Sequence, residues 1–89
     1  MNTIYRKIFL KDLSKTPIKT RKQIEEFVFH EILKMSNVTE SKKIEKMKGH
    51  LNCYKIRFGD YRLGIKIDKD KLIFERILHR KDIYKYFPK

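Results

Sequence analysis

The hydrophobic pattern of the C-terminal half predicts three consecutive β-strands. Runs rich in β-branched and aromatic residues, separated by short polar segments, cover residues 52–58, 61–67 and 72–78. Gly59 and Asp60 join the first two runs, and this pair favours a two-residue hairpin turn. The charged segment 68–71 joins the second run to the third. Three strands linked by hairpins form an antiparallel meander.

The N-terminal half begins with a strand-like segment and continues with helical periodicity. Residues 3–9 are rich in β-branched and aromatic side chains that alternate imperfectly, which predicts a short first strand. Apolar residues then follow a helical stripe, so we predict a helix that ends near Met35. Two starts fit this helix: an N-cap and first helical position at Thr16 and Pro17, or a capping box formed by Thr20 and Gln23.

Two further segments have helical spacing. Residues 41–48 place Ile44 and Met47 three positions apart among lysines, which predicts a second short helix on the surface. The C-terminal segment 79–89 also has helical spacing, but Pro88 would end a helix at once. This segment therefore forms either one helical turn or an extended arm.

These elements predict an α+β fold in a single domain that spans residues 1–89. The order is strand, two helices and three strands. Both N-terminal helices pack on one face of the antiparallel meander, and a short C-terminal helix or arm follows it. The other face of the sheet is left for solvent or a ligand. A chain of 89 residues can bury one modest core but not two.

Charge and composition narrow the class of partner. Lys and Arg total 23 against 11 Asp and Glu, and the net charge of +12 is typical of proteins that bind nucleic acid or another polyanion. Cys53 is the single cysteine and the three histidines are scattered, so we expect no disulfide, metal site or cofactor. No apolar stretch reaches the ~20 residues of a membrane span, and we expect a cytoplasmic protein without membrane contact.

One face of the first predicted hairpin carries a cluster of cations. Alternation places Lys55, Arg57 and Arg62 on this face, and the hairpin turn sets Arg57 directly opposite Arg62. Like charges directly opposite one another destabilise a sheet, so folding alone does not explain them. Phosphate is the commonest anionic partner of such a cluster. Gly64 lies opposite Lys55 and leaves space beside it, which predicts a shallow basic groove.

Two segments follow one another in an order typical of a known toxin family: GHLNCYKIRFGDYRLGIKID, residues 49–68, and HRKDIYK, residues 79–85. Through them the chain resembles the RelE/ParE superfamily of type II toxin–antitoxin toxins, on the RelE side. RelE-like toxins are ribosome-dependent endoribonucleases that cut mRNA in the A site, and each is neutralised by a cognate antitoxin. The resemblance therefore implies mRNA, the ribosome and an antitoxin as partners. We expect the antitoxin to be acidic, because it must cover a surface of net charge +12.

The resemblance also implies a set of five catalytic residues. The family's catalytic lysine falls on Lys55, the basic residue two positions later on Arg57, and the arginine of the next strand on Arg62. The late arginine falls on Arg80 and the C-terminal tyrosine on Tyr84. The best-known RelE members have lysine where this chain has Arg57, and the segment before their tyrosine is longer.

The chemistry of metal-independent RNA cleavage requires these residue types. The neighbouring 2′-OH attacks the phosphate, so one group must remove its proton, another must stabilise the developing charge, and a third must protonate the leaving 5′-oxygen. Arginine suits only the electrostatic role, because its pKa is too high for proton exchange. Lys55 and Tyr84 are the proton-transfer candidates, and either can serve as the general base. Histidine is a common acid in catalysis, so His79 can share the acid role or be an ordinary surface residue.

The remaining basic residues suggest a broader contact with RNA. We expect these lysines either to be solvated or to contact the ribosomal RNA backbone: Lys42, Lys43, Lys46, Lys48 and Lys81. Two alternatives to the nuclease remain open. One is a ParE-like toxin that inhibits gyrase and does not need the catalytic set, and the other is a non-catalytic basic module that binds RNA or protein through the same face.

Overall fold

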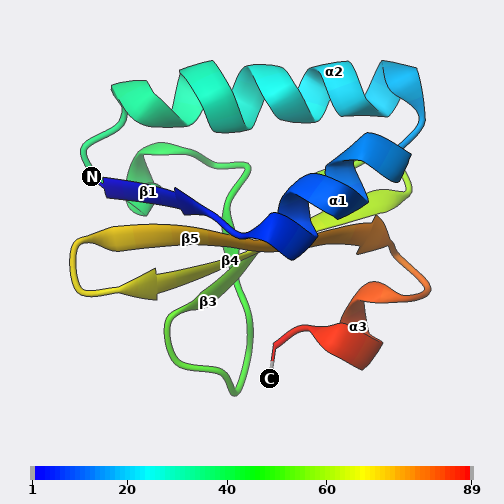
Figure 1. Ribbon diagram of the computed structural model, residues 1–89. Helices are drawn as coiled ribbons and strands as arrows, with labels where there is room; N and C mark the ends of the chain where they lie inside the picture. Colours follow the sequence, from blue (N-terminus) through cyan, green and yellow to red (C-terminus); the bar gives the residue numbers. More distant parts are fainter. Residues whose placement is uncertain (1, 89) are drawn as a thin grey trace.

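Helices α1 and α2 cover one face of a five-stranded sheet, and α3 lies on the other face (Figure 1). The computed structural model describes residues 2–88, apart from the side chain of Thr39. In chain order the elements are β1 (Asn2–Tyr5), α1 (Lys7–Lys15), α2 (Ile18–Glu26), η1 (Phe27–Glu31), η2 (Ile32–Lys34), η3 (Val38–Glu40), β2 (Glu45–Lys46), β3 (Cys53–Phe58), β4 (Tyr61–Asp68), β5 (Lys71–His79) and α3 (Ile83–Tyr86). The predicted α+β class is confirmed.

The sheet has the strand order β1-β5-β4-β3-β2. Its strands β3, β4 and β5 are the predicted antiparallel meander, which is confirmed, and β1 and β2 add one edge strand on each side. β1 runs parallel to β5, so the sheet is mixed. The predicted hairpin register is also confirmed, because Arg57 pairs with Arg62. Gly59 has a φ of +59°, as the first central residue of a type II′ turn requires.

The first predicted strand is shorter than expected, because the chain enters α1 soon after Tyr5. Phe9 and Leu13 lie four positions apart on this helix and are both buried against the sheet. The helix predicted to end near Met35 is confirmed, since α2, η1 and η2 follow one another from Ile18 to Lys34. Neither predicted start is correct, because the N-cap is Pro17 and the first helical residue is Ile18.

The second helix predicted over residues 41–48 is wrong. Ile44 packs against the hydrophobic core beneath the helices, whereas Met47 is buried on the opposite face of the sheet. Two side chains that lie on opposite faces cannot share one helical stripe. The segment instead contributes β2, which pairs with β3, so the two N-terminal helices of the fold are α1 and α2.

Two hydrophobic clusters lie on opposite faces of the sheet. The main core lies under α1 and α2 and contains fully buried side chains from both helices and from β3, β4 and β5. The smaller one, here called the tail cluster, consists of Met47, Cys53, Ile83 and Phe87, with Leu78 packed against it. The tail cluster holds α3 on the face that carries Lys55.

A β-bulge in β5 determines which side chains reach each face. Ile65 pairs with Phe74, but the next residue of β4, Gly64, pairs with Arg76, so Glu75 is the extra residue. Beyond the bulge, Arg76 lies on the face that carries α3. Ile77 returns to the main core.

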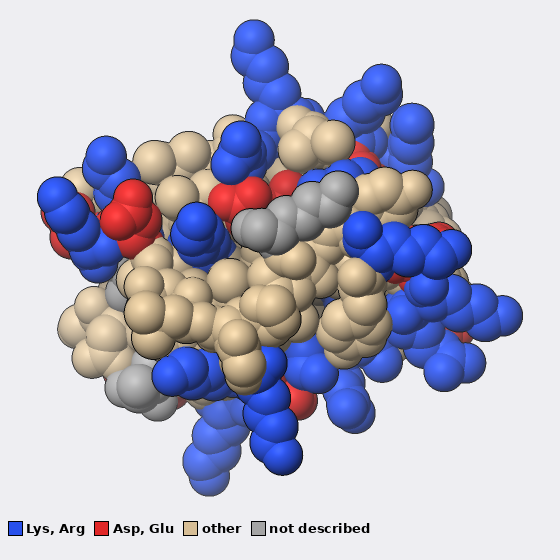
Figure 2. Space-filling view, turned by 90° about the horizontal axis from the view of Figure 1, so that it is seen from below, with Lys and Arg blue, Asp and Glu red and all other residues tan. Residues whose placement is uncertain are grey.

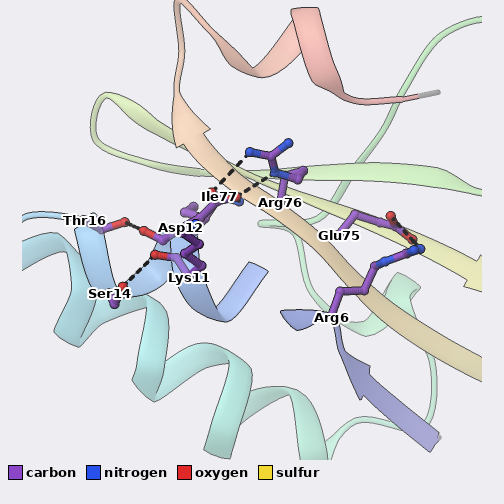
Figure 3. A network of polar contacts seen from close by, with 8 residues as sticks. All are labelled: Arg6, Lys11, Asp12, Ser14, Thr16, Glu75, Arg76 and Ile77. Atoms are coloured by element: carbon purple, nitrogen blue, oxygen red, sulfur yellow. Dashed lines mark hydrogen bonds and ion pairs between the residues drawn. The ribbon is translucent and has the colours of Figure 1, made fainter. Parts of the chain in front are cut away.

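Asp12 of α1 ties the helix to this bulged part of β5 (Figure 3). Its carboxylate accepts hydrogen bonds from Arg76 Nε at 2.7 Å and Nη2 at 3.2 Å, and from the backbone N–H of Ile77 at 3.2 Å. The Arg76 and Asp12 side chains are only 19% and 10% exposed. The hydrogen bond from Arg76 to Asp12 also raises the pKa of Arg76, so the guanidinium stays charged at any pH at which the fold would be studied.

Asp12→Ala is expected to lower the free energy of unfolding by about 2–4 kcal/mol. The substitution leaves the largely buried Arg76 guanidinium and the Ile77 N–H without this acceptor. Urea denaturation followed by circular dichroism measures the change. Ser14→Ala is the control, because Ser14 is exposed on the same helix and its hydroxyl donates only to the Lys11 carbonyl. A loss for Asp12→Ala no larger than for Ser14→Ala would contradict this role of the carboxylate.

Candidate active site

The C-terminal segment folds back over the sheet and brings Tyr84 to Lys55. It forms the single helical turn α3, which is one of the two predicted forms. Lys55 Nζ donates a hydrogen bond to the Tyr84 hydroxyl at 3.0 Å, and Nζ lies 5.5 Å from the centroid of the tyrosine ring. The two sequence-predicted proton-transfer residues, 29 positions apart in the chain, are therefore in direct contact.

The space beside Lys55 that Gly64 was expected to leave as an open groove is filled. Gly64 is the cross-strand partner of Lys55, and the Phe87 ring lies directly over it. A Cβ atom on residue 64 would lie 2.5–2.8 Å from three atoms of that ring. The space left by the missing side chain of Gly64 is therefore occupied by Phe87 and is not open to a ligand.

Arg62 and Arg80 both bind the β3–β4 turn. Arg62 Nη1 donates to the carbonyls of Gly59 at 2.7 Å and Tyr61 at 2.9 Å. The backbone N–H of Arg80 donates to the Asp60 carbonyl at 2.7 Å, and Arg80 Nε lies 3.5 Å from Asp60 Oδ1. The turn thus holds the late arginine beside the hairpin, as the sequence-predicted site requires.

Arg57 lies opposite Arg62 but turns toward β2. Its Nε is 3.9 Å from Glu45 Oε1, and both side chains are largely exposed. Each of the two opposed arginines therefore has its own acceptors, which relieves their mutual repulsion. Exposed ion pairs at this distance contribute little to stability, so an incoming phosphate can replace the carboxylate at small cost.

His79 lies away from this group of residues. It pairs with Tyr61, on the face covered by α1 and α2, and the two rings meet edge to face with centroids 5.6 Å apart. Its Nδ1 accepts a hydrogen bond from the backbone N–H of Lys81 at 3.2 Å. The structure therefore does not bring His79 to Lys55 and Tyr84, and we do not assign it the acid role.

The five lysines predicted to contact RNA are exposed, but they do not form one helical face. Lys43 lies on the helix side, with its Nζ 3.5 Å from Glu31 Oε2 and 5.9 Å from the centroid of the Phe27 ring. Lys46 belongs to β2, and Lys48 follows it in the loop before β3. Figure 2 shows that Lys and Arg side chains project around the rim of the face seen from below.

A groove of about 520 Å³ opens beside the Lys55–Tyr84 pair. Its lining combines cationic, aromatic and apolar side chains: Met47, Lys48, His50, Lys55, Tyr84, Phe87 and Pro88. The sequence had suggested no role for His50, which lines this groove. Spacing within the chain gave no signal for it, because the groove forms only when the C-terminal segment folds over the loop before β3.

Cys53 lies under the same segment, in the tail cluster, and is 7% exposed. Burial raises the pKa of its thiol, so the folded protein holds less of the reactive thiolate at a given pH than the unfolded chain. We expect Cys53 to react with iodoacetamide at pH 8 at least about tenfold more slowly in buffer than in guanidinium chloride. Mass spectrometry measures both rates, and equal rates would contradict the packing of α3 on this face.

Within residues 2–88 no helix has the length and apolar character needed to cross a membrane. The same residues contain no group of three or more His, Cys, Asp or Glu side chains that could hold a metal ion. Of the five residues predicted as catalytic, Lys55 and Arg57 lie on β3, Arg62 on β4, Arg80 directly after β5 and Tyr84 on α3.

Comparisons with known proteins agree with this fold. The model of the family described as the ParE toxin of the type II toxin–antitoxin system parDE matches residues 3–84. Toxin RelE3 of Methanocaldococcus jannaschii is 43% identical over 89 residues, which are 99% of this chain and 100% of that protein. The RelB–RelE antitoxin–toxin complex from Methanococcus jannaschii contains a chain that superposes with a TM-score of 0.80 at 41% identity, covering 96% of this chain and 99% of that one.

A more distant structure shares the fold alone. The isolated Escherichia coli RelE toxin superposes with a TM-score of 0.68 at 21% identity, covering 88% of this chain and 82% of that one. The family match spans nearly the whole chain, and the archaeal relative matches it from end to end. The chain therefore belongs to the RelE/ParE superfamily and is a RelE-like toxin of a type II toxin–antitoxin system.

Proposed function

We propose that this toxin is a metal-independent endoribonuclease that cleaves mRNA in the ribosomal A site and thereby inhibits translation. The observation that carries the proposal is the 3.0 Å hydrogen bond between Lys55 Nζ and the Tyr84 hydroxyl, on a face that also presents Arg57 and Arg62. Two groups that can exchange protons thus share a face of the sheet with guanidinium groups that can bind phosphate. The similarity to proteins named RelE supports the choice of reaction.

The proposed reaction breaks one P–O bond and forms another. The 2′-oxygen attacks the adjacent phosphorus while one member of the Lys55–Tyr84 pair accepts the 2′-OH proton. The bond from phosphorus to the 5′-oxygen breaks, and the other member of the pair protonates that oxygen. The products are a 2′,3′-cyclic phosphate and a free 5′-hydroxyl, so no water or redox partner is consumed.

In this reaction the arginines stabilise the negative charge that develops on the phosphate oxygens. Arg57 and Arg62 lie on the same face as Lys55. The carbonyl and carboxylate of Asp60 hold Arg80 at the β3–β4 turn, next to the pair of opposed arginines. Glu45 and Asp60 are exposed acceptors of Arg57 and Arg80 that a phosphate group can displace. The guanidinium groups then contact the scissile phosphate.

The test uses purified ribosomes programmed with a defined mRNA, in the magnesium buffer that the ribosomes require, with EDTA below the magnesium concentration to remove transition metals. We expect stoichiometric toxin to cut the mRNA once, within the A-site codon, and to leave a 2′,3′-cyclic phosphate. The Lys55→Ala, Arg62→Ala double variant is expected to leave the mRNA intact. Intact mRNA with the wild-type toxin, or full cleavage by the double variant, would reject the proposal.

Lysines on the rim of this face are proposed to bind the ribosomal RNA backbone. Lys48 lines the groove beside the Lys55–Tyr84 pair, Lys46 lies on β2, and Lys42 and Lys81 are also exposed. Each phosphate contact makes binding more sensitive to salt, so removing two of these charges is expected to reduce the slope of log affinity against log salt. An unchanged slope for a Lys46→Ala, Lys48→Ala variant would exclude the contact.

Inhibition of gyrase is the alternative, because the matching family model is that of the ParE toxin. A supercoiling assay with purified gyrase separates the two functions. Inhibition of supercoiling with A-site mRNA left intact would favour this alternative, whereas the Lys55–Tyr84 contact favours the nuclease.

We further propose that an acidic cognate antitoxin neutralises the toxin. The structure that matches with a TM-score of 0.80 is of a RelB–RelE antitoxin–toxin complex, and a net charge of +12 calls for a partner of opposite sign. Co-purification with the product of a neighbouring small acidic reading frame tests the partner. A stable complex that does not suppress toxicity would contradict its role as antitoxin.

A further inference from the structure

One row of residues across the sheet meets three aromatic side chains of the C-terminal segment. Lys55 of β3 pairs with Gly64 of β4, which pairs with Arg76 of β5. Lys55 contacts Tyr84, and the Phe87 ring covers Gly64. The Arg76 guanidinium carbon lies 5.1 Å from the centroid of the Tyr86 ring. Three adjacent positions of the sheet thus contact three residues of the C-terminal segment. Hydrophobic packing in the tail cluster accounts for the contact of Phe87 but not for those of Tyr84 and Tyr86.

Arg76 occupies this row because of the bulge in β5. Without the extra residue, continued pairing from Ile65 and Phe74 would set Glu75 opposite Gly64. A carboxylate in that place has no attraction for an aromatic face, whereas a guanidinium does. The bulge therefore exchanges an anion for a cation at the position that Tyr86 covers.

Arg76 is also fixed by Asp12, which holds the guanidinium through two nitrogens (Figure 3). A long arginine side chain normally samples many rotamers, and this clamp restricts it to one orientation. Asp12 belongs to α1, which packs on the main core. A continuous set of contacts therefore runs from α1 through Arg76 and Tyr86 to the helical turn that carries Tyr84.

We propose that Arg76 is a positioning residue: it contacts Tyr86, fixes the orientation of α3 on the sheet and so holds Tyr84 against Lys55. Its catalytic consequence rests on the proposed nuclease function, whereas its effect on α3 does not. Arg76 itself lies outside the reacting groups, since its guanidinium is bound to Asp12.

The experiment measures the position of α3 and the reaction separately. Hydrogen exchange of residues 83–87, where Phe87 N–H donates to the Ile83 carbonyl at 2.8 Å, reports whether the turn stays closed. Steady-state cleavage of mRNA with programmed ribosomes in excess over toxin gives kcat and KM. We expect Arg76→Met and Tyr86→Leu each to accelerate this exchange at least about fivefold and to lower kcat about 10–100-fold with KM unchanged.

Conservative variants and a neighbouring ion pair supply the controls. Tyr86→Phe keeps the ring that Arg76 contacts and is expected to retain most of the wild-type rate. Arg76→Lys keeps a cation but loses the planar group that Asp12 holds through two nitrogens, so it is expected to recover only part of the loss. Glu75→Gln removes the adjacent ion pair with Arg6, whose atoms are 3.3 Å apart, and is expected to change neither readout. Tyr86→Leu leaves the Asp12–Arg76 pair in place and keeps the test valid if Arg76→Met unfolds.

Three results would overturn the inference. One is normal exchange of residues 83–87 in both Arg76→Met and Tyr86→Leu. Another is faster exchange spread evenly over the sheet in Tyr86→Leu, which would indicate a merely structural role. A third is faster exchange at α3 together with a wild-type kcat. If the wild-type protein does not cleave mRNA, the proposed nuclease function fails, while the exchange data alone still decide whether Arg76 holds α3.

Discussion

Lys55→Arg is expected to slow mRNA cleavage about 10²–10⁴-fold, which is the usual contribution of a positioned acid or base. Arginine keeps the positive charge and the ability to donate a hydrogen bond to Tyr84, but it does not release a proton near neutral pH. Binding to the ribosome is therefore expected to change by less than about threefold. Single-turnover cleavage and co-sedimentation with ribosomes measure the two quantities on the same preparation.

Two companion variants sharpen this result. Tyr84→Phe keeps the ring over Lys55 but removes the hydroxyl that accepts its hydrogen bond, so it is expected to reduce cleavage by a similar factor. Lys66→Arg makes the same chemical change at an exposed position of β4 outside the site and is expected to be silent. Wild-type cleavage by Lys55→Arg would show that only charge is needed at this position, as in a binding module.

Gly64→Ala is expected to abolish most of the mRNA cleavage, although it adds only one methyl group. The added Cβ would lie 2.5–2.8 Å from the Phe87 ring, so the ring must move and carry α3 with it. Gly64 is not among the glycines with positive φ, so the backbone itself accepts alanine. We expect cleavage to fall about 10²-fold and the free energy of unfolding to fall by about 1–3 kcal/mol.

The matched test of this steric cause is a second substitution at the ring. Phe87→Leu makes the side chain smaller and branched, and in the Gly64→Ala background it is expected to restore part of the cleavage rate. Additive losses in the double variant would contradict a direct clash between residues 64 and 87. Faster hydrogen exchange confined to residues 83–87 in Gly64→Ala would support the displacement of α3.

Local sequence patterns predicted those parts of the fold that local contacts determine. The hairpin register at Gly59, the three-stranded meander and the helix ending near Met35 all follow from turn chemistry and hydrophobic spacing. The strand predicted over residues 3–9 was too long, because Phe9 fits a strand that continues from β1 as well as the helical pair with Leu13 that the structure shows. The contact with the core under α1 decided between them.

Long-range packing determined what the sequence did not predict. Regular alternation from Phe74 would put Arg76 on the face covered by the helices, and only the bulge places it beside Tyr86. The contact of Tyr84 with Lys55 likewise depends on the whole segment folding back, which no local spacing encodes. The family resemblance pointed to Lys55 and Tyr84, but it did not indicate the groove beside them, the packing of Phe87 on Gly64 or the contacts of Arg76.

The division of the hydrophobic residues between two faces separates folding from activity. The main core contains most of the buried side chains, so we expect it to dominate the melting temperature of the chain. The tail cluster is smaller, and we expect it to open at a lower free-energy cost than the whole fold. Substitutions in the tail cluster can therefore abolish toxicity in a protein that still expresses well and melts cooperatively. A screen for survival of cells that express the toxin would enrich such variants, and the positions that it returns would map the docking of α3 more sensitively than thermal denaturation does.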